Sequence, residues 1–212
     1  MPAAKNAMAA GFDGVEIHAG NGYLIDQFFW DGTNQRTDRW GGDLVKRTTF
    51  AAEIVKACRA AVGADFPIVL RYSQWKQQDY AARLAQTPGE LEQLLKPLAD
   101  AGVDIFHASN RRFWTPEFEG SNLNLAGWTK KLTGKPVITV GSVGLDTDFI
   151  SAFVSKGAEQ TGEQHFDRLI EMISQNEIDL VAVGRALLID PAWALKLRDG
   201  RFSEFKAYTA KA

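Results

Sequence analysis

The sequence predicts an α/β fold in which five repeated strand–helix units build a parallel β-sheet. One observation behind this is that short apolar runs alternate with longer helical patterns along the whole chain. Another is that these runs lie roughly 30 to 50 residues apart, an interval that suits right-handed crossovers between parallel strands. The five predicted strands are Val15–His18, Ile68–Arg71, Asp104–Ala108, Val137–Val140 and Leu180–Val183.

Helical patterns lie before, between and after these strands. Thr87 followed by Pro88 and Glu90 forms a helix entry, because Thr87 can cap the first turn and Glu90 lies three residues on. The segment 146–175 is helical in pattern, but Gly157 and Gly162 interrupt it, which indicates two helices with a break. The other predicted helices are Ala3–Ala10, Leu44–Val62 and a short segment that begins at Asp190.

Length and composition limit the classes of protein to consider. The 212 residues, 45% of them hydrophobic, suit one domain over 1–212 with a single substantial core. A formal net charge of -2 argues against binding to nucleic acid or to anionic membranes. The single cysteine, Cys58, excludes a disulfide framework within the chain, and no apolar run approaches the ~18 residues of a membrane-spanning helix. We therefore expect a cytoplasmic location.

The stretch from Gly11 to Phe28 holds three polar side chains in close succession. His18, Asn21 and Tyr23 follow directly from the first predicted strand, and glycines on both sides of Asn21 permit a sharp turn there. The carboxyl ends of parallel strands are where this class of fold places its chemistry. These three side chains are therefore the first candidates for a catalytic site.

The ends of later strands add a second group of candidates. Arg71 ends the second predicted strand, where an ion pair with Glu16 is the alternative to a functional role. Gly141 and Ser142 follow the fourth predicted strand, and backbone N–H groups after such a strand can hold a phosphate. Gly184 and Arg185 follow the fifth predicted strand and offer the same arrangement, with the charge of the arginine in addition.

Two segments, Ile17–Phe28 and Asn34–Gly42, closely resemble the old yellow enzyme family of FMN-dependent NAD(P)H oxidoreductases. The resemblance implies that His18 and Asn21 donate hydrogen bonds to the carbonyl oxygen of an enone-type substrate. It also implies that Tyr23 protonates the substrate α-carbon after flavin N5 delivers a hydride to the β-carbon. Physically, the implied roles are electrostatic stabilisation of an enolate and general-acid catalysis. FMN is the implied cofactor, with NADH or NADPH as the reductant.

The same resemblance assigns the remaining candidates. Arg71 is expected at the N1/O2 edge of the flavin, where its charge favours the reduced anion. The backbone at Gly141, Ser142, Gly184 and Arg185 is expected to hold the FMN phosphate. The aromatic pair Phe113 and Trp114 lies in the long loop 110–127, where the family's substrate pocket receives aromatic side chains, so both are candidates for substrate contact. The alternative is that the loop buries them to stay folded. No residue is assigned to a metal.

The resemblance further implies that the chain is a partial (β/α)8 TIM barrel that lacks the first three units of the family barrel. Five strands would leave two open sheet edges, so we expect self-association through them. The chain by itself would then lack measurable enone reduction. One alternative is a non-catalytic half-barrel that pairs its edges with another chain. Another is a metal-dependent barrel lyase or isomerase with Glu16 and His18 as ligands, which the shortage of further ligands with suitable spacing disfavours.

Overall fold

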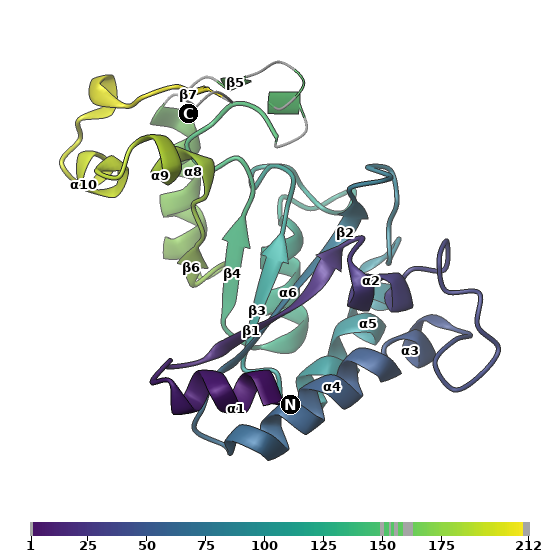
Figure 1. Ribbon diagram of the computed structural model, residues 1–212. Helices are drawn as coiled ribbons and strands as arrows, with labels where there is room; N and C mark the ends of the chain where they lie inside the picture. The colour runs from purple at the N-terminus through teal and green to yellow at the C-terminus, as the bar shows by residue number, and fades with distance from the viewer. Residues whose placement is uncertain (1, 149–150, 153, 155–156, 159–162, 210–212) are drawn as a thin grey trace.

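Five parallel strands form the main sheet, and they neighbour one another in the order of the chain. The computed structural model describes residues 2–148, 151–152, 154, 157–158 and 163–209. The strand arrows point toward the same end of the molecule (Figure 1), which confirms the predicted parallel arrangement. The strands are β1 (Val15–Asn21), β2 (Ile68–Lys76), β3 (Ile105–Ser109), β4 (Val137–Val140) and β6 (Leu180–Val181).

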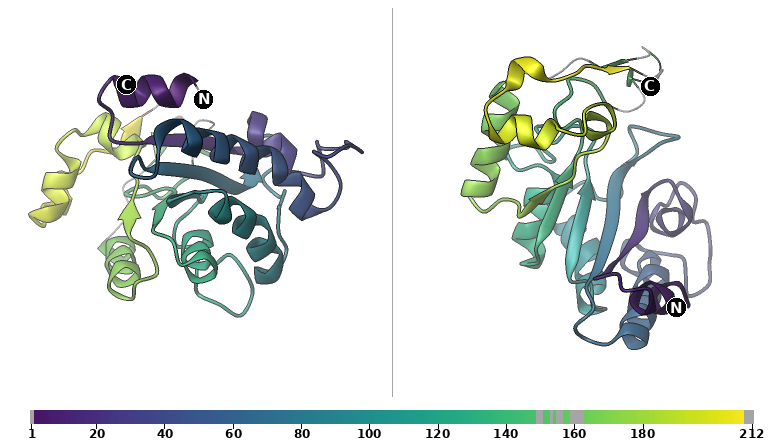
Figure 2. Two further views of the ribbon diagram at one scale, coloured as in Figure 1. Left: turned by 90° about the horizontal axis from the view of Figure 1, so that it is seen from below. Right: turned by 60° about the vertical axis from the view of Figure 1, so that its left-hand side comes forward.

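Helices follow the strands and cover one side of the sheet. Figure 2, left, shows α4, α5, α6 and α8 following one another around the same side of the curved row of strands. The helices are α1 (Pro2–Ala9), α2 (Leu24–Phe29), α3 (Leu44–Arg47), α4 (Thr49–Val62), α5 (Pro88–Asp100), α6 (Leu125–Thr133), α8 (Glu163–Ser174), α9 (Arg185–Ile189), α10 (Trp193–Arg198) and the 3-10 turn Phe202–Glu204. None of the helices in this described part of the chain is long and apolar enough to cross a membrane.

The structure corrects one of the predicted helices and places a strand in the break predicted within another segment. Leu44–Val62 is not one helix, because α3 ends before Thr48, whose hydroxyl donates to the carbonyl oxygen of Val45, and α4 begins at Thr49. The break predicted at Gly157 contains a short strand, β5 (Gly157–Ala158), which pairs antiparallel with β7 (Tyr208–Thr209). The second half of the segment 146–175 is helical as expected in α8, and part of the first half lies outside the described residues.

Strand β2 shows why the sheet has two different faces. Leu70 and Tyr72 point toward the helices and are completely buried, whereas Arg71 between them is only partly buried. Burial of a side chain such as Leu70 stabilises the fold by about 1.5–3 kcal/mol. The Tyr72 hydroxyl lies 2.5 Å from the hydroxyl of Thr129 in α6, so this buried polar group is satisfied. The core therefore lies between sheet and helices, and the opposite face carries the polar side chains.

The polar ends of the strands meet at one edge of the molecule. Arg71 lies opposite His18 in the β1–β2 register and opposite His107 in the β2–β3 register. The C-terminal segment with α10 and β7 lies beyond the tip of the β4 arrow (Figure 1), at the same end of the sheet. This end holds the loops that follow β1, β2, β3, β4 and β6, and the site is built there.

Candidate functional site

An irregularity at the end of β1 places Asn21. The register with β2 shifts between Ala19 and Asn21, and Asn21 adopts a left-handed backbone conformation with φ of 60°. Its N–H donates to the hydroxyl of Ser73 at 2.7 Å, which holds this uncommon conformation in place. Gly20 is needed beside it, because a Cβ there would lie 3.0 Å from the backbone nitrogen of Ser73. The Asn21 side chain is consequently fixed toward the cavity described below.

His18 and Tyr23 lie together at the exposed side of this turn. Their ring centroids are 5.0 Å apart with an interplanar angle of 52°, and Tyr23 is 52% exposed. Partial burial and the positive charge of Arg71 lower the pKa of His18, while Glu16 raises it. His18 is therefore a neutral imidazole at pH 7, and a neutral imidazole can present one N–H to a carbonyl oxygen. The structure brings all three predicted catalytic residues to one place.

Arg71 contributes the positive charge next to these residues. Its Nη2 donates to the Ser109 hydroxyl at 3.3 Å, and the same hydroxyl lies 3.4 Å from the side-chain amide of Asn21. The Nε of Arg71 is buried and has no hydrogen-bond partner among the described residues. A buried, unsatisfied N–H of this kind is costly in a folded protein and marks a place where a ligand acceptor would be stabilised.

Arg71 and Glu16 do not form the ion pair that was the alternative to a functional role for Arg71. Glu16 instead pairs with His107, whose Nδ1 lies 2.7 Å from the Glu16 carboxylate. Partial burial raises the pKa of Glu16, but the hydrogen bond from His107 and the nearby positive charges outweigh this and lower it. Strand β3 supplies the partner across β2, because Glu16, Arg71 and His107 lie on the same face of the sheet. Arg71 is left available to a ligand.

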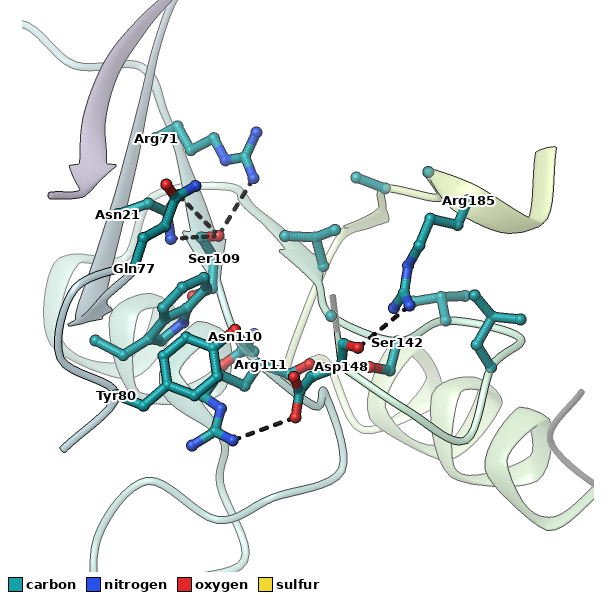
Figure 3. A pocket seen from close by; sticks show the side chains of 17 residues that line it. Asn21, Arg71, Gln77, Tyr80, Ser109, Asn110, Arg111, Ser142, Asp148 and Arg185 are labelled. Atoms are coloured by element: carbon teal, nitrogen blue, oxygen red, sulfur yellow. Dashed lines mark hydrogen bonds and ion pairs between the residues drawn. The ribbon is translucent and has the colours of Figure 1, made fainter. Parts of the chain in front are cut away.

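A cavity of about 320 Å³ extends from Asn21 and Arg71 to the loops after β4 and β6. Figure 3 shows Asn21 and Arg71 on one side of this cavity, and Ser142 and Arg185 on the other. The lining residues come from the carboxyl ends of all five strands and include Asn21, Arg71, Trp75, Tyr80, Ser109, Arg111, Gly141, Ser142, Gly184 and Arg185. All five predicted cofactor-binding residues therefore line one cavity, although they are up to 114 positions apart (185 - 71) in the chain.

The loop after β4 forms the far end of the cavity. Gly141 has φ of 136°, and a Cβ there would lie 2.5 Å from the carbonyl oxygen of Asn110, so only glycine fits. The Ser142 hydroxyl lies 3.0 Å from the carbonyl oxygens of Arg111 and Thr147, which directs it into the loop. Arg185 donates to the carbonyl oxygen of Thr147 at 2.7 Å, so its guanidinium is held against the same loop.

Sequence reasoning missed several residues of this cavity. Arg111 lies 3.2 Å from Asp148, and its guanidinium carbon lies 3.9 Å from the ring centroid of Tyr80. Trp75 donates to the Ser109 carbonyl oxygen at 2.8 Å. The arginine pair that follows β3 was the available signal for a positively charged wall. The contribution of Tyr80 could not be anticipated, since it depends on how the chain turns after β2.

Phe113 and Trp114, the candidate substrate contacts, pack with the main core. Phe113 has no exposed surface, and its side chain packs in the main core. Trp114 stacks on the imidazole of His165, with centroids 4.0 Å apart and an angle of 14° between the planes. Neither residue lines the cavity, because the loop after β3 turns back on α6 through a hydrogen bond from the Asn124 amide to the Phe113 carbonyl oxygen.

The donor set of the cavity fits FMN and does not fit a metal ion. The unsatisfied Nε of Arg71 suits an electron-rich ring edge, while Arg185 and the glycine-containing turn at Gly141 suit a phosphate at the other end. Among the residues that the structure describes, no group of three or more His, Cys, Asp or Glu side chains could hold a metal. Glu16, a ligand of the alternative metal site, already pairs with His107 through its carboxylate.

Comparison with known proteins gives three kinds of similarity. Residues 1–160 match the NADH:flavin oxidoreductase / NADH oxidase family. An NADH oxidase of Thermoanaerobacter brockii is 34% identical over 96% of this chain and 29% of its own length. A probable NADH-dependent flavin oxidoreductase, YqiG of Bacillus subtilis (strain 168), is 33% identical over 94% of this chain and 49% of its own length. The chain thus spans less than half the length of these relatives.

A solved structure shows the same fold. The old yellow enzyme homologue from Zymomonas mobilis superimposes with a TM-score of 0.71 over 97% of this chain and 51% of its own, at 22% sequence identity. The fold similarity and the sequence match agree with the resemblance of the segments that begin at Ile17 and Asn34. The chain belongs to the NADH:flavin oxidoreductase / NADH oxidase family, whose cofactor is flavin (FMN) and whose reductant is NADH or NADPH.

Proposed function

We propose that this chain carries the substrate side and the phosphate end of the active site of an FMN-dependent oxidoreductase that reduces the C=C bond of α,β-unsaturated carbonyl compounds. The observation that carries the proposal is the convergence of His18, Asn21 and Tyr23 beside a cavity that Arg71 and Arg185 line. A polar turn, a positive charge and a phosphate-binding loop are together what this chemistry needs.

The chemistry divides between cofactor and protein. Bound FMN supplies the hydride for the substrate β-carbon, and NADH or NADPH restores the reduced flavin. His18 and Asn21 donate hydrogen bonds to the substrate carbonyl oxygen, where negative charge develops as the C=C bond accepts the hydride. Tyr23 gives its phenolic proton to the α-carbon, and solvent returns a proton to Tyr23. The product is the saturated carbonyl compound, so two electrons and two hydrogens are accounted for.

The exposed position of Tyr23 supports its role as the acid. With 52% of its surface accessible, the phenol can exchange its proton with water after each cycle. Its ring also packs next to that of His18, so the acid and a residue that donates to the substrate carbonyl oxygen lie on the same side of the turn. Arg71 lies level with His18 on the next strand and is suited to stabilise negative charge on the flavin.

The test is an anaerobic assay of the native protein that contains this chain, with cyclohexenone as acceptor and NADH or NADPH as donor. We expect a yellow protein with FMN bound, and a Tyr23→Phe variant that keeps FMN but loses roughly 10²–10⁴-fold in the rate of flavin reoxidation by the enone. A colourless protein, or a Tyr23→Phe variant with full activity, would refute the proposal.

The half-barrel alternative has one observation in its favour. Edge strand β6 exposes 53% of Leu180, and the following helix α9 exposes 78% of Leu188. Leu180 lies in β6, which is an outer strand of the five-stranded sheet. Sizing of the 212-residue chain by light scattering distinguishes self-association from a monomeric state, and absorbance between about 350 and 500 nm reports whether flavin is bound.

A further inference from the structure

Asp26 and Lys76 form an ion pair that is completely buried. Lys76 Nζ lies 2.8 Å from Asp26 Oδ1, and neither side chain has any exposed surface. Lys76 also lies 3.4 Å from the carbonyl oxygen of Ser73. Because transfer of two charges out of water often costs as much as their attraction returns, a buried pair of this kind is weak support for stability alone. The position of the pair next to the turn at Gly22 indicates a second role.

The second oxygen of Asp26 holds the turn that carries the proposed catalytic residues. Asp26 Oδ2 accepts the N–H of Gly22 at 2.6 Å, directly between Asn21 and Tyr23. Gly22 has φ of 86°, a left-handed backbone conformation that favours glycine. Asp26 itself lies in the first turn of α2, which follows Tyr23.

Lys76 links the same turn to the sheet. It ends β2, and its Cα pairs with that of Asn21 beyond the register shift in β1. The next residue, Gln77, donates its N–H to the Asn21 carbonyl oxygen at 3.3 Å. The turn is therefore held from two sides, by α2 through Asp26 and by β2 through Lys76.

We propose that Asp26 and Lys76 are positioning residues that fix the turn Gly20–Tyr23, so that Asn21 and Tyr23 face substrate together. The hydrogen bond from Lys76 Nζ fixes the orientation of the Asp26 carboxylate. The same carboxylate accepts the Gly22 N–H, which fixes the backbone of the turn. Neither residue lines the cavity, so both act through the turn. The catalytic roles of Asn21 and Tyr23 in this inference rest on the proposed function. The hydrogen bonds by which Asp26 and Lys76 fix the turn do not depend on that function.

Two double variants separate positioning from stability. Asp26→Asn with Lys76→Gln is uncharged and keeps a carbonyl acceptor for the Gly22 N–H. Asp26→Leu with Lys76→Met is also uncharged and of similar size, but it offers no acceptor. Apolar replacement of a buried ion pair is often neutral or stabilising, and the Asn/Gln variant keeps hydrogen-bonding groups at both positions. Both proteins are expected to fold, and thermal unfolding is measured for each.

Hydrogen exchange followed by mass spectrometry tests the hold on the turn without any need for activity. In the native protein, we expect peptides that cover residues 20–24 to exchange at least about tenfold faster in the Leu/Met variant than in the Asn/Gln variant. Peptides from α5 should exchange equally in both proteins. Equal exchange of residues 20–24 in two folded variants would overturn the proposal, whatever the protein catalyses.

Activity supplies the second readout. We expect the Leu/Met variant to lose roughly 10²-fold in kcat for enone reduction with an unchanged dissociation constant for FMN, because a small displacement of reacting groups is costly. The Asn/Gln variant should retain most of kcat even if its Tm is the lower of the two. Activity that follows Tm instead would show that the pair is merely structural. A wild-type protein without enone reduction would count against the proposed function and leave the exchange result to decide the positioning.

Discussion

The Nδ1 atom of His107 lies 2.7 Å from the carboxylate of Glu16. Glu16 lies two residues before His18 in β1, and the proposed chemistry requires the His18 imidazole. This contact holds the negatively charged Glu16 carboxylate on the same face of the sheet as His18 and Arg71. Among the neighbouring groups, Arg71 and His107 lower the pKa of His18, and Glu16 raises it. Two residues that do not line the cavity, Glu16 and His107, therefore add to the effects of burial and of Arg71 on the pKa of His18.

A Glu16→Gln variant tests this relationship. Removal of the negative charge withdraws the interaction that favours the imidazolium, so the pKa of His18 should fall below its wild-type value. Two-dimensional NMR of the imidazole ring protons across a pH titration measures the change. Glu53→Gln, which removes an exposed carboxylate paired with Arg39, is the matched control and should leave the His18 titration unchanged.

Gly141→Ala should damage the phosphate end of the cavity. The added Cβ would lie 2.5 Å from the Asn110 carbonyl oxygen at a φ of 136°, so the loop must move. We expect FMN affinity to fall at least about tenfold, or ~1.4 kcal/mol, when measured by fluorescence titration. Gly134→Ala is the control, because its φ of 66° imposes backbone strain where nothing lies within 4 Å. Equal affinities in the two variants would contradict the assignment.

Arg185→Glu should weaken FMN binding by charge. Arg185 is expected to form a charge-assisted hydrogen bond to the phosphate, worth about 1.5–3 kcal/mol, so its loss corresponds to roughly a tenfold to 150-fold rise in the dissociation constant. Arg198→Glu reverses the charge at an exposed position and is the control. The dependence of the dissociation constant on salt should also become less steep in Arg185→Glu, and an unchanged constant would place the phosphate elsewhere.

Glu117 should make the stability of the fold depend on pH. Burial raises the pKa of Glu117 to about 6, against the partial opposition of Arg83. A raised folded-state pKa means that the folded chain holds the proton more tightly, so this contribution is complete below about pH 4.5 and is lost as pH rises through about 6. The loss amounts to roughly 2 kcal/mol. Urea unfolding at several pH values should show this fall, and Glu117→Gln should remove it.

The 212-residue chain purified alone should self-associate, bind FMN weakly and lack measurable enone reduction. Strands β1 and β6 are the outer strands of the five-stranded sheet, and unpaired strand edges are sites of association. A Leu180→Lys substitution places a charge on the edge strand, where 53% of Leu180 is exposed, and should shift the chain toward the monomer. A wild-type chain that is yellow, monomeric and active would contradict this prediction.

The sequence by itself determined the order and direction of the main strands. Apolar runs of the right length with helical patterns between them leave few alternatives, because parallel strands need long crossovers and each run must be buried. It also determined which strand ends would carry polar groups, since Arg71, Gly141 and Gly184 directly follow apolar runs. These are local properties of the chain, and the structure confirms that the three residues line one cavity.

Only the tertiary structure decided which polar groups pair. The sequence offered Glu16 as an ion-pair partner for Arg71, but in the fold His107 of β3 reaches the Glu16 carboxylate across β2, from 91 positions away. Asp26 and Lys76 meet across 50 positions, and Phe113 is buried although its loop resembles a substrate-binding one. A contact between distant residues depends on register and on how loops turn over a core, and the apolar periodicity that defines each element carries no information about either.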